Sequence, residues 1–262
     1  MCPLARSATN GDGGFFERGA MPAHCLIVET DRHGLVLIDT GIGEADVRDP
    51  NGRLGGLFTN VVGILPGRTT TMLGHVKRLG LDPAEVRHVI VTHLDLDHAG
   101  GLPDFPRATV HVHANEKTAA LSPTFRERER YRAVHWAHGP DWQTYDATGE
   151  PWRGFAAVRA LRGLPPEFLC VPMNGHTRGH WLVAVETKDG PLVHCGDAYF
   201  HRGAVEGGPM PWGIASFEKL LAFDRKKIAA NHARLRELAA SGGGVRVFSA
   251  HDPVELERFT RS

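Results

Sequence analysis

Short hydrophobic runs separated by polar turns dominate the first part of the chain, and this pattern predicts β-strands. Residues 23–40 (AHCLIVETDRHGLVLIDT) contain two such runs around the turn at 31–34, which predicts a hairpin. The runs RHVIVT at 87–92 and TVHVHA at 109–114 predict two further strands. Between the hairpin and these strands, apolar residues at helical spacing predict a helix over 68–80 that ends at a glycine.

The second half of the chain repeats this order of strands and helices. Strands are expected near 155–160, 168–173, 181–187, 191–196 and 245–250, and helices across 216–240 and from residue 253. Because both halves mix strands with helices and no obvious linker separates them, we predict an α/β layered fold. We expect one domain over residues 1–262, with an irregular N-terminal segment over 1–20.

Two stretches lie outside this alternation. The glycine-rich stretch 41–67 is expected to be a long loop near a functional site, and the charged stretch 123–137 to be a helix followed by a loop. The loop over 41–67 is unusually apolar, which fits an apolar acyl chain or a homodimer contact equally well. Its large apolar residues are Leu54, Leu57, Phe58, Val61, Val62, Ile64 and Leu65.

Composition and charge restrict the class of protein. Hydrophobic residues make up 42% and charged residues 23% of the chain, which is typical of a globular protein and excludes disordered and fibrous classes. Thirty basic residues balance thirty acidic ones, so we expect neither a nucleic-acid nor a membrane partner. The start of the chain lacks a signal-peptide core and no apolar run approaches about 18 residues, so a cytoplasmic location is expected.

Histidine is abundant, with 16 residues, and it is the commonest metal ligand in proteins. The four cysteines form no CxxC pair, so they are expected to be free thiols and not part of a zinc knuckle or a disulfide framework. They are Cys2, Cys25, Cys170 and Cys195.

The segment HLDLDHAGG, residues 93–101, follows the predicted strand at 87–92 and carries four ligand-type side chains. In an extended segment His93 and Asp95 project to the same side, and Asp97 and His98 can address a second point as the chain turns. The apolar residues between them can anchor the loop in the core. This segment therefore predicts a metal site.

Three later residues supply candidate partners for these ligands. His176 in GHTRGH, Asp197 in CGDA and His251 in SAHD each follow a predicted strand. Ligands delivered from the ends of strands are typical of a rigid scaffold with its site at one edge.

The order of these motifs resembles the metallo-β-lactamase superfamily, from about residue 23 to residue 259. The matching motifs are the Asp-Thr-Gly at 39–41, the HxHxDH-type loop at 93–98, the GHTxGH stretch at 175–180, GDA at 196–198 and the late His251. The resemblance implies an αββα four-layer sandwich, in which two mixed sheets pack face to face with helices outside. It also implies a dinuclear metal site at one edge of the sheets.

The resemblance further implies which residues hold the metals, with two Zn²⁺ ions expected. One ion takes His93, Asp95 and His176. The other takes Asp97, His98 and His251, and the carboxylate of Asp197 bridges the two ions. Asp95 stands where the family has its second histidine. A single filled site therefore remains open. Iron also remains open, because the first set has the two-histidine, one-carboxylate composition of non-haem Fe(II) centres.

The substitution at position 95 changes the charge of the expected centre. A carboxylate in place of an imidazole removes one unit of positive charge, so the centre is expected to activate bound water less than its all-histidine counterpart.

Three further residues near these motifs each have two interpretations. Asp39 is a turn residue or supports a metal ligand. His180 orients substrate or caps the strand that follows it. Tyr199 places its phenol near a developing oxyanion, as in some lactonases of the superfamily, or is a packed aromatic residue.

The predicted function is a metal-dependent hydrolase in which a metal-bound hydroxide attacks the carbonyl of a small-molecule lactone or ester, with Asp97 orienting the nucleophile. The HAGG, GHTxGH and AHD stretches look most like the acyl-homoserine-lactone lactonase and related esterase branch. A glutathione-thioester hydrolase and an iron-dependent sulfur dioxygenase of the same superfamily are the enzymatic alternatives. A non-catalytic binding or signalling protein with a drifted metal site is the alternative of another class.

Overall fold

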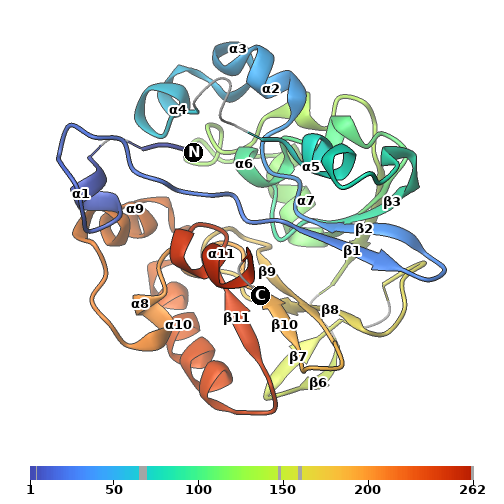
Figure 1. Ribbon diagram of the computed structural model, residues 1–262. Coiled ribbons are helices and arrows are strands. Elements are labelled where there is room, and N and C mark those ends of the chain that lie inside the picture. The colour runs from blue at the N-terminus through green and yellow to red at the C-terminus, as the bar shows by residue number, and fades with distance from the viewer. Residues whose placement is uncertain (4, 65–69, 147–148, 159–160, 261–262) are drawn as a thin grey trace. The chain divides into compact units, whose positions relative to one another are not determined.

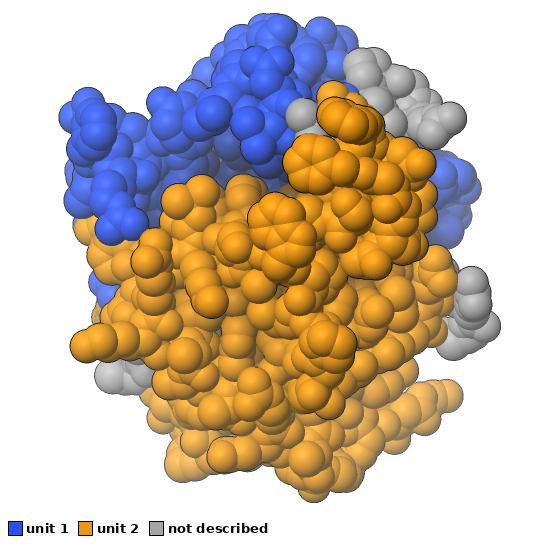
Figure 2. All heavy atoms as spheres, turned by 90° about the vertical axis from the view of Figure 1, so that its left-hand side faces the viewer, with its two compact units in different colours: residues 1–2, 23–145 blue, residues 3–22, 146–262 orange. Residues whose placement is uncertain are grey.

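The computed structural model describes the chain except for residues 4, 65–69, 147–148, 159–160 and 261–262 (Figure 1). The chain divides into two compact units, which Figure 2 colours separately. Unit 1 comprises residues 1–2 and 23–145, and unit 2 comprises residues 3–22 and 146–262.

Unit 1 is built on a five-stranded mixed sheet in the order β1-β2-β3-β4-β5. Its strands are β1 (Leu26–Thr30), β2 (Gly34–Ile38), β3 (Val86–Ile90), β4 (Thr109–His113) and β5 (Asp141–Tyr145). The first two strands are antiparallel and form the predicted hairpin, and the other neighbours pair in parallel. The predicted strands at 87–92 and 109–114 are confirmed as β3 and β4, whereas β5 lies in a stretch that we expected to be a loop.

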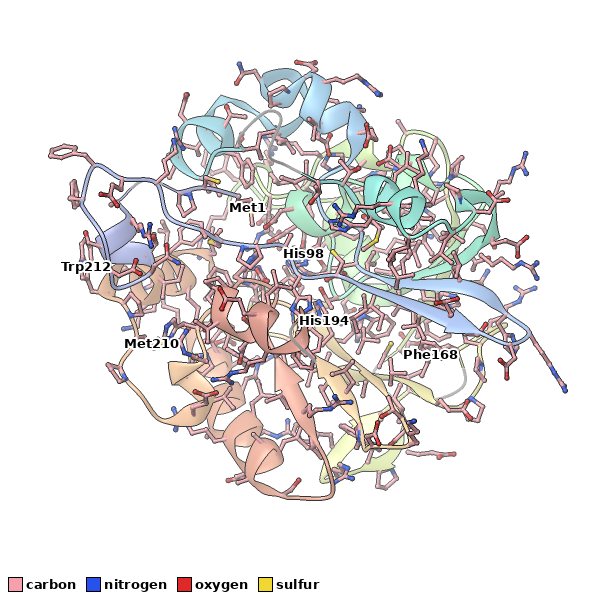
Figure 3. All side chains as sticks on the ribbon, in the orientation of Figure 1. Met1, His98, Phe168, His194, Met210 and Trp212 are labelled. Carbon is pink, nitrogen blue, oxygen red and sulfur yellow. The ribbon has the colours of Figure 1, made fainter. Side chains whose placement is uncertain are left out.

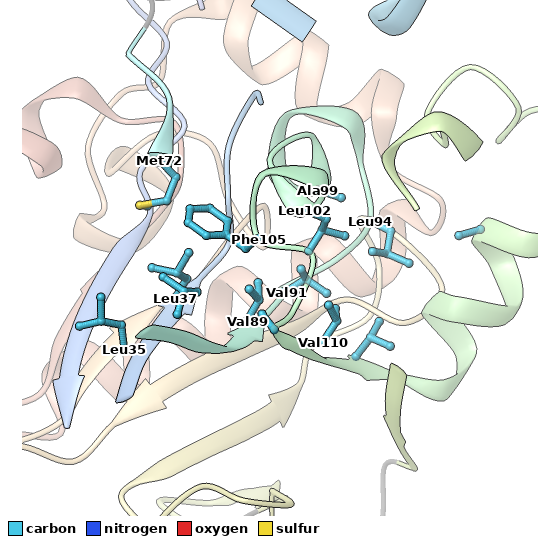
Figure 4. Packing of buried hydrophobic residues seen from close by; sticks show 14 of the residues in the cluster. Leu35, Leu37, Met72, Val89, Val91, Leu94, Ala99, Leu102, Phe105 and Val110 are labelled. Atoms are coloured by element: carbon cyan, nitrogen blue, oxygen red, sulfur yellow. The ribbon is translucent and has the colours of Figure 1, made fainter. Parts of the chain in front are cut away.

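Alternate residues of these strands form the core of unit 1, as Figure 4 shows. Leu35 and Leu37 on β2, Val89 on β3 and Val110 on β4 lie in one buried cluster. Side chains two residues apart on a strand point to the same face, so the alternation of the sequence builds this apolar face directly. Met72 packs into the same cluster from α5 (Met72–Arg78), which confirms the helix predicted over 68–80.

The prediction of a long loop over residues 41–67 is wrong for most of this stretch. It contains three short helices: α2 (Glu44–Arg48), α3 (Pro50–Leu54) and α4 (Gly56–Val61). Asp49 caps α3 by accepting a hydrogen bond from the backbone N–H of Gly52, and Pro50 provides a favourable first residue. The capping contacts thus outweigh the low helix propensity of the glycines in this stretch. Leu65 and the rest of 65–67 lie outside the described residues.

The helix predicted over 123–137 is also wrong, since only the short 3-10 helix η3 (Ala133–His135) forms there. Glu127 accepts hydrogen bonds from both the backbone N–H and the hydroxyl of Thr124, and such local contacts favour turns over helix. The helix of this region lies earlier, as α7 (Ala114–Leu121). Unit 1 also contains the 3-10 helices η1 (Pro83–Glu85) and η2 (Leu102–Asp104), and the helix α6 described below.

Unit 2 contains a second mixed sheet in the order β11-β10-β9-β8. Its strands are β8 (Phe168–Pro172), β9 (Trp181–Val185), β10 (Leu192–His194) and β11 (Arg246–Phe248), and a separate hairpin is formed by β6 (Glu150–Trp152) and β7 (Phe155–Ala157). Only β10 and β11 are parallel among the neighbours of this sheet. The predicted strands are confirmed, although residues 159–160 of the first one lie outside the described part of the chain.

The helices of unit 2 are α1 (Arg6–Thr9), α8 (Gly203–Glu206), α9 (Trp212–Leu221), α10 (Arg225–Ala240) and α11 (Pro253–Thr260). Leu235 and Leu238 of α10 pack with Leu169, Val171 and Leu182 of the sheet in one buried cluster. Helices α9 and α10 confirm the helical prediction over 216–240, and α11 confirms the one from residue 253. The short helix α1 interrupts the segment over 1–20 that we expected to be irregular.

Each unit therefore combines a mixed sheet with helices, which confirms the α/β class. The expectation of a single domain stays a prediction. All four cysteines are free thiols, and Cys170 and Cys195 are buried. Among the described residues, no helix combines the length and apolar character that a membrane crossing requires.

Candidate metal centre

The loop after β3 carries the four candidate ligands of unit 1. His93 and Asp95 precede α6 (Leu96–Ala99), which carries Asp97 and His98. Leu94 and Leu96 alternate with these residues and are buried in two apolar clusters, so they anchor the loop as predicted.

The loop brings its ligands together in two pairs. Nε2 of His93 lies 3.4 Å from Oδ2 of Asp95, and Nε2 of His98, labelled in Figure 3, lies 3.9 Å from Oδ2 of Asp97. All four residues are buried. Each pair thus places an imidazole nitrogen beside a carboxylate oxygen, which confirms the pairing expected from the sequence spacing.

Asp39, at the end of β2, holds both histidines of this loop in place. Its Oδ2 accepts a hydrogen bond from Nδ1 of His98 at 2.9 Å and from the hydroxyl of Thr92 at 2.7 Å, and its Oδ1 accepts from the backbone N–H of Thr92. The Thr92 hydroxyl donates to Asp39, so it can accept from Nδ1 of His93, 2.9 Å away. Both rings are therefore held through Nδ1, which leaves Nε2 as the ligand nitrogen. This arrangement favours the supporting role over a simple turn residue.

Glu116 on α7 fixes the backbone of the same loop, and sequence reasoning missed it. Its Oε1 accepts hydrogen bonds from the backbone N–H of Leu94 at 3.0 Å and from the hydroxyl of Tyr131 at 3.1 Å. Glu116 is fully buried, so these bonds act without competition from solvent.

Arg130 is a second residue that sequence reasoning missed. Its Nη2 lies 3.1 Å from Oδ2 of Asp95, and only 10% of each side chain is exposed. The residue that replaces the second histidine of the family pattern is therefore one half of a buried ion pair. Nothing in the sequence singled out Arg130, because it lies among other charged residues in the stretch that we expected to be a helix.

Unit 2 brings its three candidate ligands together around Asp197. Nε2 of His176 lies 3.3 Å from Oδ2 of Asp197, and Nε2 of His251 lies 3.0 Å from Oδ1. His176 follows β8, Asp197 follows β10 and His251 follows β11, as predicted. Nε2 of His251 also lies 3.2 Å from Oδ2, so the carboxylate of Asp197 lies beside both imidazoles.

Two supporting contacts fix the orientation of these ligands. Nδ1 of His251 donates to the carbonyl of Pro22 at 2.8 Å, so its Nε2 is the nitrogen directed at Asp197. Nε2 of His180 accepts from the backbone N–H of Asp197 at 3.0 Å, and its Nδ1 donates to the carbonyl of Met173 at 3.2 Å. Of the two interpretations of His180, the structure favours the structural one.

Tyr199 lies in the core of unit 2. Its hydroxyl donates to Oε1 of Glu255 at 2.9 Å, and Oε2 of the same carboxylate accepts from the backbone N–H of Ser249. Burial raises the pKa of Tyr199 well above its usual value and raises the pKa of Glu255 to about 7. These contacts favour the packed aromatic over the catalytic phenol, whose role toward an oxyanion stays a prediction.

The donor set fits a divalent metal ion. Within each of three pairs, the two ligand atoms lie within 4.8 Å of each other. The pairs are His93 with Asp95, Asp97 with His98, and His176 with Asp197. Imidazole nitrogens and carboxylate oxygens are ligands of Zn²⁺ and of iron, and buried carboxylates need a cation or hydrogen-bond donors nearby.

Comparison with known proteins supports this interpretation. A sequence model described as the metallo-β-lactamase superfamily matches residues 18–251. A probable metallo-hydrolase of Mycobacterium tuberculosis is 44% identical over 237 residues, which cover 89% of this chain and 76% of that protein. An N-acyl homoserine lactonase of Rhizobium johnstonii is 29% identical over 240 residues, covering 90% of this chain and 84% of the lactonase.

Solved structures share the fold. An N-acyl homoserine lactone hydrolase with N-hexanoyl-L-homoserine bound at its catalytic metal centre has a TM-score of 0.70 and 24% identity, covering 98% of this chain and 92% of that one. A dizinc quorum-quenching lactonase has a TM-score of 0.66 and 16% identity, covering 97% of this chain and 84% of that one.

Proposed function

The chain belongs to the metallo-β-lactamase superfamily, and on that premise we propose that this metal-dependent hydrolase opens the ring of a lactone, with N-acyl homoserine lactones as its substrate class. The observation that carries the proposal is the presence of buried imidazole–carboxylate groups after the strands β3, β8, β10 and β11. The likeness to named N-acyl homoserine lactonases supports the choice of substrate.

We further propose that two Zn²⁺ ions are held in the manner that the family resemblance implies. The ligands are then His93, Asp95, Asp97, His98, His176, Asp197 and His251. The donor types and the position of Asp197 between two imidazoles support this assignment. When bound, divalent metal ions lower the pKa of a coordinated water and polarise a carbonyl.

The residues of the chain have separate tasks in this reaction. Asp97 accepts a hydrogen bond from the attacking water and so directs its lone pair at the lactone carbonyl. Asp39 keeps Nε2 of His93 and His98 available as ligand nitrogens, because it holds the His98 ring through Nδ1 directly and the His93 ring through the Thr92 hydroxyl. Glu116 fixes the backbone between His93 and Asp95. In ring opening the water oxygen bonds to the carbonyl carbon, the ring C–O bond breaks, and the leaving ring oxygen takes a proton from the water, so the product is a hydroxy acid.

The test combines a metal measurement with a substrate panel. The full-length protein as isolated is analysed by plasma mass spectrometry and then incubated with N-hexanoyl homoserine lactone, with the ring-opened acid detected by mass spectrometry. We expect about two zinc ions per chain and hydrolysis that falls at least about a hundredfold in Asp97→Asn. Asp31→Asn, at an exposed turn, serves as the control.

Other results of this test would contradict the proposal in identifiable ways. Hydrolysis of a glutathione thioester but of no lactone indicates a thioesterase. One iron per chain with oxygen consumption on a glutathione persulfide indicates a sulfur dioxygenase. A folded chain that binds no zinc indicates a binding or signalling protein.

A further inference from the structure

The ion pair between Asp95 and Arg130 lies at the position where the chain departs from its family pattern. Oδ2 of Asp95 contacts Nη2 of Arg130 at 3.1 Å and lies 3.4 Å from Nε2 of His93. A single carboxylate oxygen is thus shared between a guanidinium and a candidate ligand histidine. Because both side chains of the ion pair are nearly buried, solvent screens their attraction only weakly.

A second contact holds Arg130 against this loop. Tyr131, the next residue, donates its hydroxyl to Glu116, which in turn accepts from the backbone N–H of Leu94. Arg130 therefore contacts Asp95 directly, and the next residue, Tyr131, is connected through Glu116 to Leu94, the residue before Asp95. Tyr131 is itself buried in the core of unit 1, so the guanidinium is positioned by a rigid neighbour.

The charge of Arg130 offsets the charge that Asp95 introduces. An aspartate in place of the family's histidine removes one unit of positive charge from the expected centre, and a guanidinium in direct contact with that aspartate returns it. An Asp–Arg pair is therefore equivalent in net charge to the neutral imidazole that it replaces. Arginine suits this task because it stays protonated even when it is buried.

We propose that Arg130 is a positioning residue of the metal centre, and that Asp95 and Arg130 act together as the replacement for the second histidine. Arg130 orients Oδ2 of Asp95 beside His93 and keeps the charge of the centre at the value of the HxHxDH pattern. The proposal rests on the metal site of the proposed function but is independent of the substrate.

A double-mutant cycle tests this coupling without an activity assay. Asp95→His, Arg130→Met and the double variant are compared with the native chain by thermal unfolding after chelation of metals. Each single variant removes the counter-charge that this ion pair gives to the remaining buried charge, so we expect its Tm to fall by about 6–15 °C. The double variant removes both charges and is expected to recover at least about half of that loss.

Zinc affinity, measured by competition with a chromophoric chelator, provides the second readout. In Asp95→His the Arg130 cation faces the bound ion, so we expect zinc to bind at least about tenfold more weakly than in the native chain. The double variant has the family's histidine and no opposing cation, so its zinc affinity is expected to return to about that of the native chain. Arg130→Lys retains the charge, so it should keep most of the stability that Arg130→Met loses.

The control is Arg126→Met, which removes an exposed arginine from the same segment and should change neither quantity. Additive losses in Tm, together with equal zinc affinity in Asp95→His and the double variant, would overturn the proposal. If neither histidine variant folds, the comparison of Arg130→Lys with Arg130→Met decides, because equal losses exclude a role for the charge. A lactone that is not hydrolysed leaves these results unaffected, so the failure of the proposed function is recognised separately.

Discussion

Buried carboxylates that are not themselves candidate ligands hold the candidate ligands in place. Asp39 supports His98 directly and His93 through Thr92, and Glu116 fixes the backbone N–H of Leu94 between two ligands. Such supporting residues set the tautomer and the direction of a ligand imidazole. A conservative change at either position should therefore weaken metal binding without removing a ligand.

Asp39→Asn tests this support. Asparagine has one acceptor oxygen where aspartate has two, so either the bonds from His98 and the Thr92 hydroxyl or the bond from the Thr92 backbone N–H are lost, and the support of the imidazoles is weakened. We expect zinc affinity to fall by about 10–100-fold, as measured by chelator competition. Asp31→Asn is the matched control at an exposed turn. Unchanged zinc affinity in Asp39→Asn would show that the histidines are oriented by the rest of the loop.

Glu255 gives a prediction for the pH dependence of stability. Burial raises its pKa from 4.5 to about 7 in the folded chain, so between these values the folded state binds a proton that the unfolded state has released. Stability must then decrease as the pH rises through this window, by on the order of 3 kcal/mol. Glu255→Gln cannot ionise, and its amide can still bond Tyr199 and Ser249.

The measurement is the thermal unfolding midpoint of the native chain and of Glu255→Gln at about pH 5 and about pH 8. The native chain is expected to lose more stability across this range than the variant. The difference between the two curves isolates Glu255 from other titrating groups. Parallel curves would mean that Glu255 titrates in the folded chain as it does in the unfolded one.

Among the elements, α4 presents apolar side chains that the core does not use. Leu57 is 65% exposed and Val61 is 50% exposed, and the two lie one helical turn apart. Their exposure leaves open both functions expected for the apolar residues of 41–67, namely contact with an acyl chain and a dimer contact. Because the proposed substrates carry an apolar acyl chain, we expect the first of these functions.

We therefore expect Leu57→Ser/Val61→Ser to raise KM for long-chain N-acyl homoserine lactones several-fold more than for short-chain ones. Each methylene that leaves an apolar contact costs about 0.8 kcal/mol, so the effect should grow with chain length. Leu79→Ser, which changes an exposed leucine after α5, is the control. A shift in sedimentation from dimer to monomer with unchanged KM would assign this surface to a subunit contact.

The element scale also separates what the sequence could predict from what it could not. The hairpin, β3, β4 and α10 carry a clear hydrophobic period, and the sequence located each of them. Strand β5 was missed because its five residues, DWQTY, gain their strand conformation from pairing with β4. The charged stretch at 123–137 was predicted as a helix, but the contacts of Glu127 with Thr124 favour turns there.

The candidate site shows the same division. Ligand-type residues were recognisable because metals accept few side chains, at short spacings and after strands. Asp39 was recognised as a possible support because it lies in a motif. Arg130 and Glu116 were missed because their roles depend on contacts between residues 22–35 positions apart in the sequence, which no local pattern encodes.

For the whole molecule, the distribution of ligands between the two units leads to a final prediction. Unit 1 carries four of the proposed ligands and unit 2 carries three. A ligand that binds only the folded state stabilises it by mass action. With free zinc at about 100 times Kd the gain is about 2.7 kcal/mol, so we expect Tm to rise by about 5–10 °C over the chelated protein.

Hydrogen exchange measured with and without zinc locates this stabilisation. Slower exchange is expected both in the loop at 93–101 and around His251, because ligation restrains the segments that carry the ligands. Asp197→Ala removes the carboxylate beside His176 and His251, so it should abolish most of the zinc-dependent rise in Tm. A rise in Tm that is retained in Asp197→Ala would contradict the assignment of Asp197 as a zinc ligand.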